Sequence, residues 1–153
     1  VNNKAQHKRR AAGALVEVLG DVERRARLSA EAVVAARAVD PALQALGRPQ
    51  DALEVYRQGL RRHPKNPGYL SNIAVILANQ GEPERALAEA EKAISLDDRF
   101  TSAFINAGFF LQTLGRLGEA AQRFERALSL EPDNAAVRDA LQAIKHRLAV
   151  ESR

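Results

Sequence analysis

The sequence predicts an all-α solenoid of stacked helical hairpins, and two observations support that prediction. Residues 67–134 consist of two loosely similar segments of 34 residues, with small and apolar residues at the same offsets in both. A repeat of this length is typical of solenoids built from helical hairpins. Hydrophobic residues make up 46% of the chain but aromatic residues only 5%, a composition that suits close helix packing better than a β-sandwich.

The recurring residues are Ile73, Leu77, Gly81, Ala86 and Ala93 in the first segment and Ala107, Leu111, Gly115, Ala120 and Ala127 in the second. The second segment also contains Phe104, Gly108, Phe124 and Pro132. This pattern resembles the tetratricopeptide repeat (TPR), and the Arg- and Ala-rich usage suggests a bacterial type of TPR protein. The resemblance implies a right-handed α-solenoid of TPR helix-turn-helix repeats. It also implies that the first helix of each hairpin lines a concave groove where a partner docks.

We expect a single TPR domain over the whole chain. Its expected parts are a basic leading helical segment (1–32), an irregular repeat (33–66), two clear repeats (67–100 and 101–134) and a C-terminal capping helix with a tail (135–153). The last helix offers one apolar stripe, Leu141, Ile144 and Leu148, and a polar opposite side. A solenoid needs such a helix at its end, so the stack is expected to close there.

Proline and glycine mark where the helices should begin and turn. Proline is tolerated at the first position of a helix but costs about 3 kcal/mol inside one, so Pro49 and Pro83 are expected at helix starts. Gly47, Gly81 and Gly115 are each 34 residues apart and are expected in the hairpin turns. Helices are predicted over residues 5–19, 21–39 and 42–46, and then over residues 50–62, 68–79, 83–95, 102–114, 117–129 and 135–149.

The basic residues concentrate near the N-terminus. Residues 1–28 hold seven Lys or Arg against three acids, whereas residues 67–100 hold three bases against six acids. A basic segment can contact phosphates, but no aromatic residue lies between Val1 and Leu46, so stacking on bases is not supported. A solvated helix is the better interpretation, and a nucleic-acid partner is not expected.

No residue pattern indicates catalysis. The chain has no cysteine, and His7, His63 and His146 are far apart, so neither thiol chemistry nor a metal site is predicted. No apolar run approaches the roughly 18 residues of a membrane span. We therefore expect no enzyme activity, no cofactor, no metal, no small-molecule substrate and no membrane span. The compartment stays open: the cytoplasm is slightly favoured, and the periplasm is the alternative if a signal has been removed.

Asn72 and Asn106 occupy the same position in the two clear repeats, 34 residues apart. Asparagine is a mediocre helix former, and its amide can pair with the main chain of a peptide. The family resemblance places both on the groove, where we expect them to hold a peptide. The alternative is that they bridge helices within the stack. The other residues expected on the groove are Ser71, Val75, Asn79, Ser102, Ile105, Phe109, Gln112 and Thr113.

Phe109, Phe110 and Leu111 are three consecutive apolar residues, which cover more than one face of a helix. One of the two phenylalanines is therefore expected inside the stack and the other at the groove or at an interface. The alternative places both rings inside. An exposed aromatic residue that a partner buries commonly contributes about 2 kcal/mol to binding.

One TPR subclass grips the C-terminal carboxylate of chaperone tails with Lys and Asn residues at fixed positions. Arg37 and Asn72 match two of those five positions, whereas Pro41, Ser102 and Asn106 occupy the other three. The resemblance therefore argues against a carboxylate clamp. It favours a mixed polar and apolar groove that binds an internal peptide or a helix.

The function that the sequence favours is a non-catalytic scaffold that docks a peptide or helix of a partner protein in the concave groove of the TPR stack. Two alternatives stay open. In the first alternative, the chain is a regulatory or substrate-docking portion of a larger enzyme such as a glycosyltransferase. In the second, it is a unit that self-associates through the Phe109 and Phe110 region into a homo-oligomer.

Overall fold

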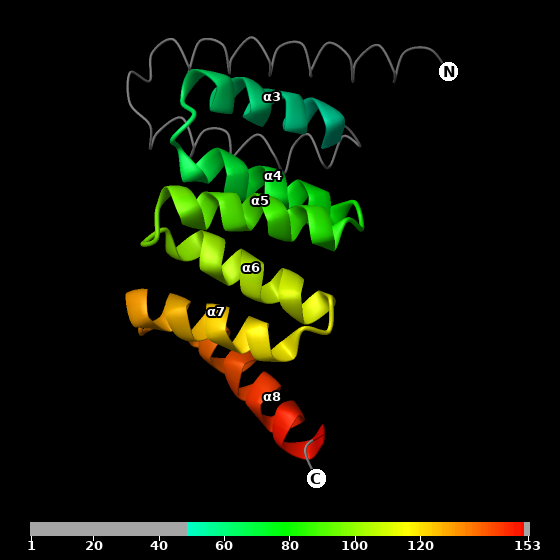
Figure 1. The fold of residues 1–153 in the computed structure, drawn as a ribbon, viewed down its shortest axis with the longest axis vertical. Helices are drawn as coiled ribbons and strands as arrows, with labels where there is room; N and C mark the ends of the chain where they lie inside the picture. Colours follow the sequence, from blue (N-terminus) through cyan, green and yellow to red (C-terminus); the bar gives the residue numbers. More distant parts are fainter. Residues whose placement is uncertain (1–48, 152–153) are drawn as a thin grey trace, which may run out of the picture. The chain divides into compact units, whose positions relative to one another are not determined.

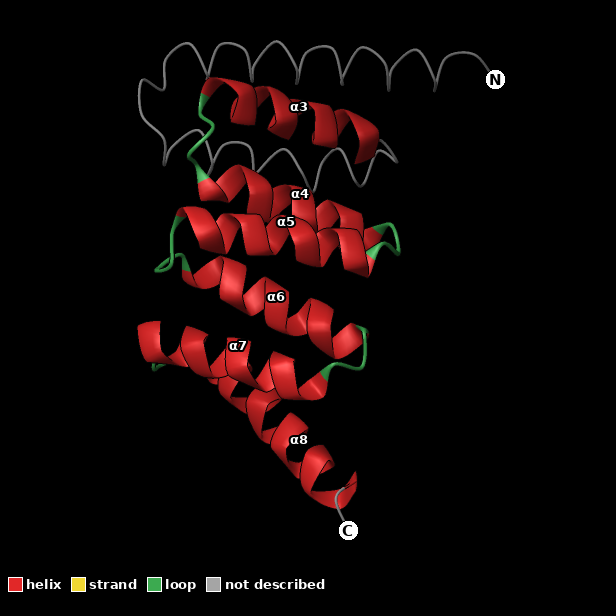
Figure 2. Ribbon diagram, in the orientation of Figure 1, coloured by secondary structure: helices red, strands yellow, loops and turns green. Residues whose placement is uncertain are grey.

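The computed structural model describes residues 49–151, which form six helices joined by loops (Figure 1; Figure 2). No strand occurs between residues 49 and 151, so the all-α fold class is confirmed for this range. The chain divides into two compact units, Val1–Pro64 and Lys65–Arg153. The predictions for the basic leading segment, for the helices over residues 5–46 and for a turn at Gly47 lie outside the described residues.

In the first unit, the described helix is α3 (Pro49–Arg62). It begins at the proline predicted to start it, where the missing N–H of proline costs no hydrogen bond. Ala52, Leu53 and Tyr56 are buried and lie on one side of the helix. Leu60, about one turn after Tyr56, is only half-buried.

The second unit contains α4 (Pro67–Asn79), α5 (Pro83–Leu96), α6 (Thr101–Thr113), α7 (Leu117–Leu130) and α8 (Ala135–Glu151). Each helix packs against the next one, and α4 also packs against α6 (Figure 1). Every predicted bound of these five helices is confirmed to within two residues. Helix α4 begins at Pro67, one residue before its predicted start, because Asn66 caps it by accepting a 2.9 Å hydrogen bond from the Gly68 N–H.

Both hairpin turns require glycine for the same conformational reason. Gly81 and Gly115 have φ angles of 80° and 74°, in the left-handed region that other residues enter only at a cost. At the first turn, the Glu82 N–H donates to the Leu77 carbonyl at 3.0 Å and the Gly81 N–H to the Ala78 carbonyl at 3.0 Å. This pair of bonds satisfies the last carbonyls of α4 and reverses the chain. The predicted turns are confirmed.

Small residues allow the helices to approach closely. Ala86, Ala90 and Ala93 of α5 are fully buried, and their methyl groups form the stripe that faces α4 and α6. In the second hairpin, Gly108 of α6 lies against the ring of Phe124 of α7, which is also fully buried. The recurring small residues of the sequence are therefore packing positions.

Helix α8 packs against α7 with one side only. Leu141 and Ile144 are buried, as predicted, and Leu148 is half-buried. The stripe also includes Val137, one turn earlier, which the prediction missed. An ion pair between Lys145 and Glu125 at 2.7 Å joins α8 to α7 at the edge of this contact.

Candidate functional site

Helices α4 and α6 are the first helices of successive hairpins and are packed side by side. The amide nitrogen of Asn106 on α6 donates a hydrogen bond to the hydroxyl of Ser71 on α4 at 2.9 Å. Asn106 thus contacts the residue directly before Asn72. Because the two asparagines occupy equivalent positions on neighbouring helices, they do not lie on opposite sides of the unit.

One strip of α6 is open to a partner. Its members are half-buried or exposed: Ser102, Ile105, Asn106, Phe109, Gln112 and Thr113. Their spacing of three and four residues places them on one side of a helix, and the residues on the opposite side are buried. The structure therefore brings together every α6 residue that the sequence assigned to the groove.

Helix α4 contributes a narrower strip. Val75 is half-buried and Asn79 is exposed, as expected of groove residues. Ala78, which follows Val75 by one turn, is also half-buried and was not predicted. We call the open residues of both helices the docking face: Val75, Ala78, Asn79, Ser102, Ile105, Asn106, Phe109, Gln112 and Thr113.

Ser71 and Asn72 differ from the expectation, because both are buried. Ser71 is 4% exposed, and its hydroxyl is the acceptor for Asn106. This bond is a bridge between helices, which was the alternative interpretation of the asparagines. Repeat position alone could not distinguish the two because the approach of α6 decides which residues of α4 are covered.

Asn72 is 9% exposed, and its amide nitrogen has no hydrogen-bond partner in the described part of the chain. A buried donor without an acceptor costs about 1–3 kcal/mol. Packing alone does not explain an asparagine here, since an apolar residue of similar size would avoid that cost.

Phe109 is the exposed aromatic residue of the docking face. Its side chain is 42% exposed, whereas Phe110 is 8% exposed. One ring is thus inside and the other outside, as the sequence predicted. The Phe109 ring lies edge-on to the ring of Phe124, with centroids 5.0 Å apart and planes at 70°. This is a favourable aromatic geometry, and it holds Phe109 against a buried residue.

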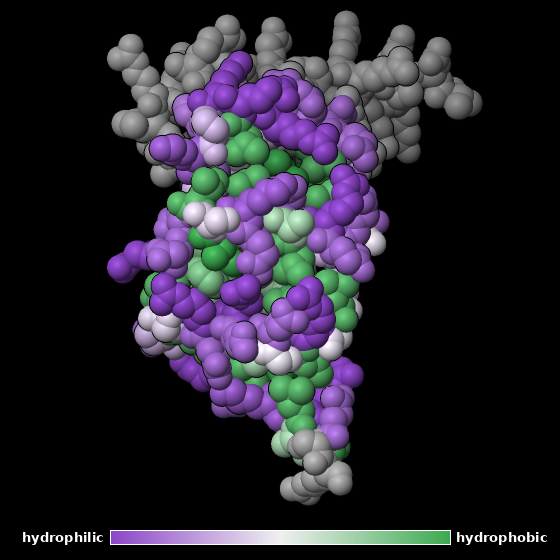
Figure 3. Space-filling model, viewed as in Figure 1, coloured by the Kyte–Doolittle hydropathy of each residue, from purple (hydrophilic) through white to green (hydrophobic). Residues whose placement is uncertain are grey.

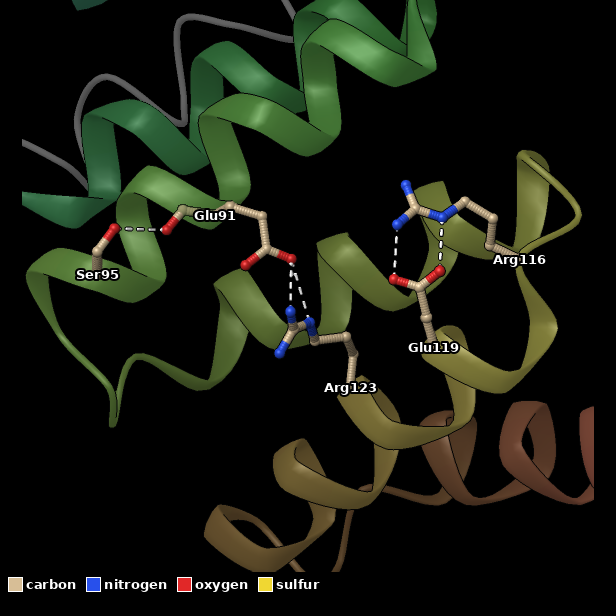
Figure 4. Close-up of polar contacts among 5 residues, drawn as sticks. All are labelled: Glu91, Ser95, Arg116, Glu119 and Arg123. Atoms are coloured by element: carbon tan, nitrogen blue, oxygen red, sulfur yellow. Dashed lines mark hydrogen bonds and ion pairs between the residues drawn. The ribbon is translucent and has the colours of Figure 1, made fainter.

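In the two hairpins, the charged residues lie on the second helices and in the loops. Arg123 of α7 pairs with Glu91 of α5 at 2.9 Å, and Arg116 forms two hydrogen bonds with Glu119 at 2.6 and 2.7 Å (Figure 4). The hydrogen bonds from Arg116 lower the pKa of Glu119 below its usual value. The Ser95 hydroxyl donates to the backbone carbonyl of Glu91 at 2.7 Å. On the face shown in Figure 3, hydrophilic residues are interspersed with hydrophobic ones in the second unit.

Neither a metal site nor a membrane-spanning helix is found in the described residues. Between residues 49 and 151, no group of three potential metal-ligating side chains is placed closely enough to hold an ion. None of the helices in that range combines the length and the apolarity needed to cross a bilayer.

Comparison with known families identifies the repeat. Tetratricopeptide repeat models match residues 41–99 and residues 101–134. The chain belongs to the tetratricopeptide repeat family. The two matched ranges contain α3 to α7, so the helices that form the docking face are TPR helices, and the TPR solenoid is confirmed as the fold.

Three proteins with TPR repeats are similar to this chain. Small glutamine-rich tetratricopeptide repeat-containing protein 2 of Mycosarcoma maydis is 29% identical over 101 residues, which are 66% of this chain and 29% of that protein. The second TPR domain of human RPAP3, solved in complex with the HSP70 peptide SGPTIEEVD, is 29% identical with a TM-score of 0.64, covering 74% of this chain and 94% of that one. The first TPR of Spaghetti (RPAP3), bound to an HSP90 peptide, has a TM-score of 0.71 at 24% identity, covering 80% of this chain and 99% of that one.

The chain thus spans less than a third of the length of the Mycosarcoma maydis protein. That relative is fungal and the RPAP3 domain is human. These relatives do not support the bacterial type suggested by the amino-acid usage.

Proposed function

We propose that this TPR chain is a non-catalytic scaffold that docks a peptide segment of a partner protein on the docking face of α4 and α6. The observation that supports this most directly is the continuous open strip on α6 with the exposed Phe109 in it. Packing within the unit leaves these residues uncovered, although the helix is well buried on its other side.

The docking face combines an aromatic anchor with groups that bind a main chain. Phe109 is held by its edge contact with Phe124, so little conformational freedom is lost when a partner covers it. Gln112 is an exposed amide about one turn after Phe109 on the same helix, and it offers both a donor and an acceptor. A segment with an apolar side chain on Phe109 can therefore also bond to Gln112 through its backbone.

In this proposal the two asparagines have different roles. Asn106 is bonded to Ser71 and holds α6 against α4, so its main effect is on the geometry of the face. The amide nitrogen of Asn72 is a buried donor that lacks a partner among residues 49–151, and a peptide carbonyl would satisfy it. Because this nitrogen is buried, a local side-chain shift must accompany that bond.

The similar structures are consistent with docking of peptides. The second TPR domain of human RPAP3, 29% identical and covered over 94% of its length, was solved with a bound peptide. The part of the Mycosarcoma maydis relative that matches this chain makes up 29% of that protein, which is therefore more than three times as long as the match. That fraction leaves open a second candidate, in which the chain is the docking portion of a larger protein.

The test selects random displayed peptides on the full chain and measures the affinity of selected peptides by fluorescence anisotropy. Phe109→Ala is expected to weaken binding about 30-fold, since an aromatic anchor contributes about 2 kcal/mol. Leu96→Ala is the matched control, because Leu96 is also 42% exposed but lies at the end of α5. Equal affinity of Phe109→Ala and the unmodified chain would contradict the proposal.

Light scattering at several concentrations separates peptide docking from self-association. A monomer at all concentrations is expected. A dimer that Phe109→Ala dissociates, with no peptide selected, would assign the same face to contacts between copies of the chain.

A further inference from the structure

The two helices of the docking face contain no charged residue. Residues 66–81, which include α4, and residues 100–115, which include α6, are free of Asp, Glu, Lys, Arg and His. By contrast, α5 alone carries five charged side chains: Glu84, Arg85, Glu89, Glu91 and Lys92. The absence of charge is thus confined to the helices that a partner would touch.

A charged side chain gains nothing from such a surface. Moving an ionised group from water to an interface costs several kcal/mol unless an opposite charge or several hydrogen bonds compensate it. The docking face supplies amides, hydroxyls and apolar groups, but no ion of either sign. Uncharged side chains, and backbone groups that accept or donate hydrogen bonds, meet no such cost.

Helix α8, which packs against α7, carries three Lys or Arg side chains, and each of them has a partner. Arg138 donates to the Pro132 carbonyl at 2.5 Å. Lys145 is paired with Glu125 of α7 at 2.7 Å, and Arg147 with Glu151 one turn further along α8 at 2.8 Å. An acidic ligand would therefore have to compete with these partners for the three cations.

We infer that the occupant of the docking face is an uncharged, extended internal segment of a partner protein, with an aromatic or aliphatic side chain against Phe109. This inference rests on the proposed function. An extended chain leaves its carbonyls available for the amides of Asn72 and Gln112, whereas the carbonyls of a helix are bonded within the helix. Helices of 13 residues are about 20 Å long, so about six extended residues span the face.

The bound peptide of human RPAP3 provides the contrasting ligand. Its sequence, SGPTIEEVD, has two glutamates and an aspartate at its C-terminal end. Ser102 and Asn106 stand where the carboxylate-gripping TPR subclass has basic residues. The docking face is therefore expected to reject acidic tails, and basic substitutions at these two positions are expected to admit them.

The test uses the peptides selected from the random library on the full chain. Asp, Glu, Lys and Arg are expected to be depleted from the docked positions. Amidation of the peptide C-terminus is expected to leave affinity unchanged. Raising salt from about 50 to about 500 mM is expected to change affinity less than about twofold, since screening acts only on charges.

The second part of the test measures a gain of binding in variants of the chain. Ser102→Lys with Asn106→Arg is expected to bind SGPTIEEVD at least about tenfold more tightly than the unmodified chain, a difference of about 1.4 kcal/mol. Ser102→Lys alone keeps the bond from Asn106 to Ser71 and is expected to show a smaller gain in affinity. The result therefore does not depend on the double variant, even if that variant folds poorly. Melting curves of both variants check the fold.

Two outcomes would overturn the inference in distinguishable ways. Acidic selected peptides, bound through a free carboxylate and released by salt, would refute the uncharged occupant while leaving the proposed function intact, provided that Phe109→Ala still weakens them. If no peptide is selected, both the proposed function and the inference fail.

Discussion

The contact between Gly108 and Phe124 allows a sharp test of the hairpin packing. A Cβ atom built on Gly108 would lie 2.5 Å from Cε1, 2.7 Å from Cδ1 and 2.9 Å from Cζ of the Phe124 ring. The ring is fully buried, and the Phe109 ring lies against it. Because a rigid ring cannot yield by rotating one flexible end, Gly108→Ala must displace α6 from α7.

The size of the effect follows from two opposing contributions. Overpacking a well-packed core costs about 1–3 kcal/mol. Replacing glycine by alanine inside a helix contributes about 1 kcal/mol in the opposite direction. Three ring atoms are within 3 Å of the new methyl group, so we expect the upper part of the overpacking range and a net loss of about 1–2 kcal/mol. For a chain of this length, that lowers the melting temperature by about 2–8 °C.

Gly118→Ala is the matched control for this prediction. Gly118 lies in α7, and a Cβ atom there would have no neighbour within 4 Å. The same chemical change is therefore expected to raise the stability by up to about 1 kcal/mol. Urea unfolding followed by circular dichroism measures both variants, and the prediction is an opposite sign for the two. If Gly108→Ala were as stable as Gly118→Ala, the close approach of α6 to the Phe124 ring would be refuted.

Two further perturbations test the turns and the surface charges. Gly81→Ala forces a side chain into a φ of 80° and should lower the free energy of unfolding by about 1 kcal/mol. Gly81→Asn should lower it less. Equal unfolding midpoints for the alanine variant and the unmodified chain would contradict this prediction. Since Arg116 lowers the pKa of Glu119, the ionised carboxylate stabilises the fold above its unfolded pKa of about 4.3, and this stabilisation is lost as the pH falls through the folded pKa. Glu119→Gln should therefore lower the melting temperature slightly near neutral pH and not in strong acid.

The helices and turns were predictable because glycine, proline and alanine act locally. Pro83 begins α5 as expected, since it fits only the first turn of a helix. Gly81 and Gly115 recur at the repeat period and adopt the left-handed conformation of a helix end. The backbone geometry at such residues can be predicted from the sequence without knowing which residues pack around them.

The docking face was only partly predictable because it depends on which helix covers which residue. The open strip of α6 was identified in full, because the family resemblance places the first helix of each hairpin at the groove and helical spacing then selects one side of it. On α4, by contrast, Ser71 was expected to be open, but α6 covers it and Asn106 bonds to it. No local signal in the sequence distinguishes a serine that lines a groove from one that accepts a bond across two helices.

The absence of charge on α4 and α6 has a different origin from their packing. Inward positions of these helices must be apolar to fill the unit, but Asn79, Gln112 and Thr113 are exposed, where lysine or glutamate would meet water at no cost. Stacking of the hairpins therefore does not require that these positions be uncharged. An uncharged partner surface does require it, because each charge left on the face would have to be desolvated on binding. Substitutions at Asn79, Gln112 and Thr113 therefore test the proposed selection for an uncharged partner without disturbing the packing of the hairpins.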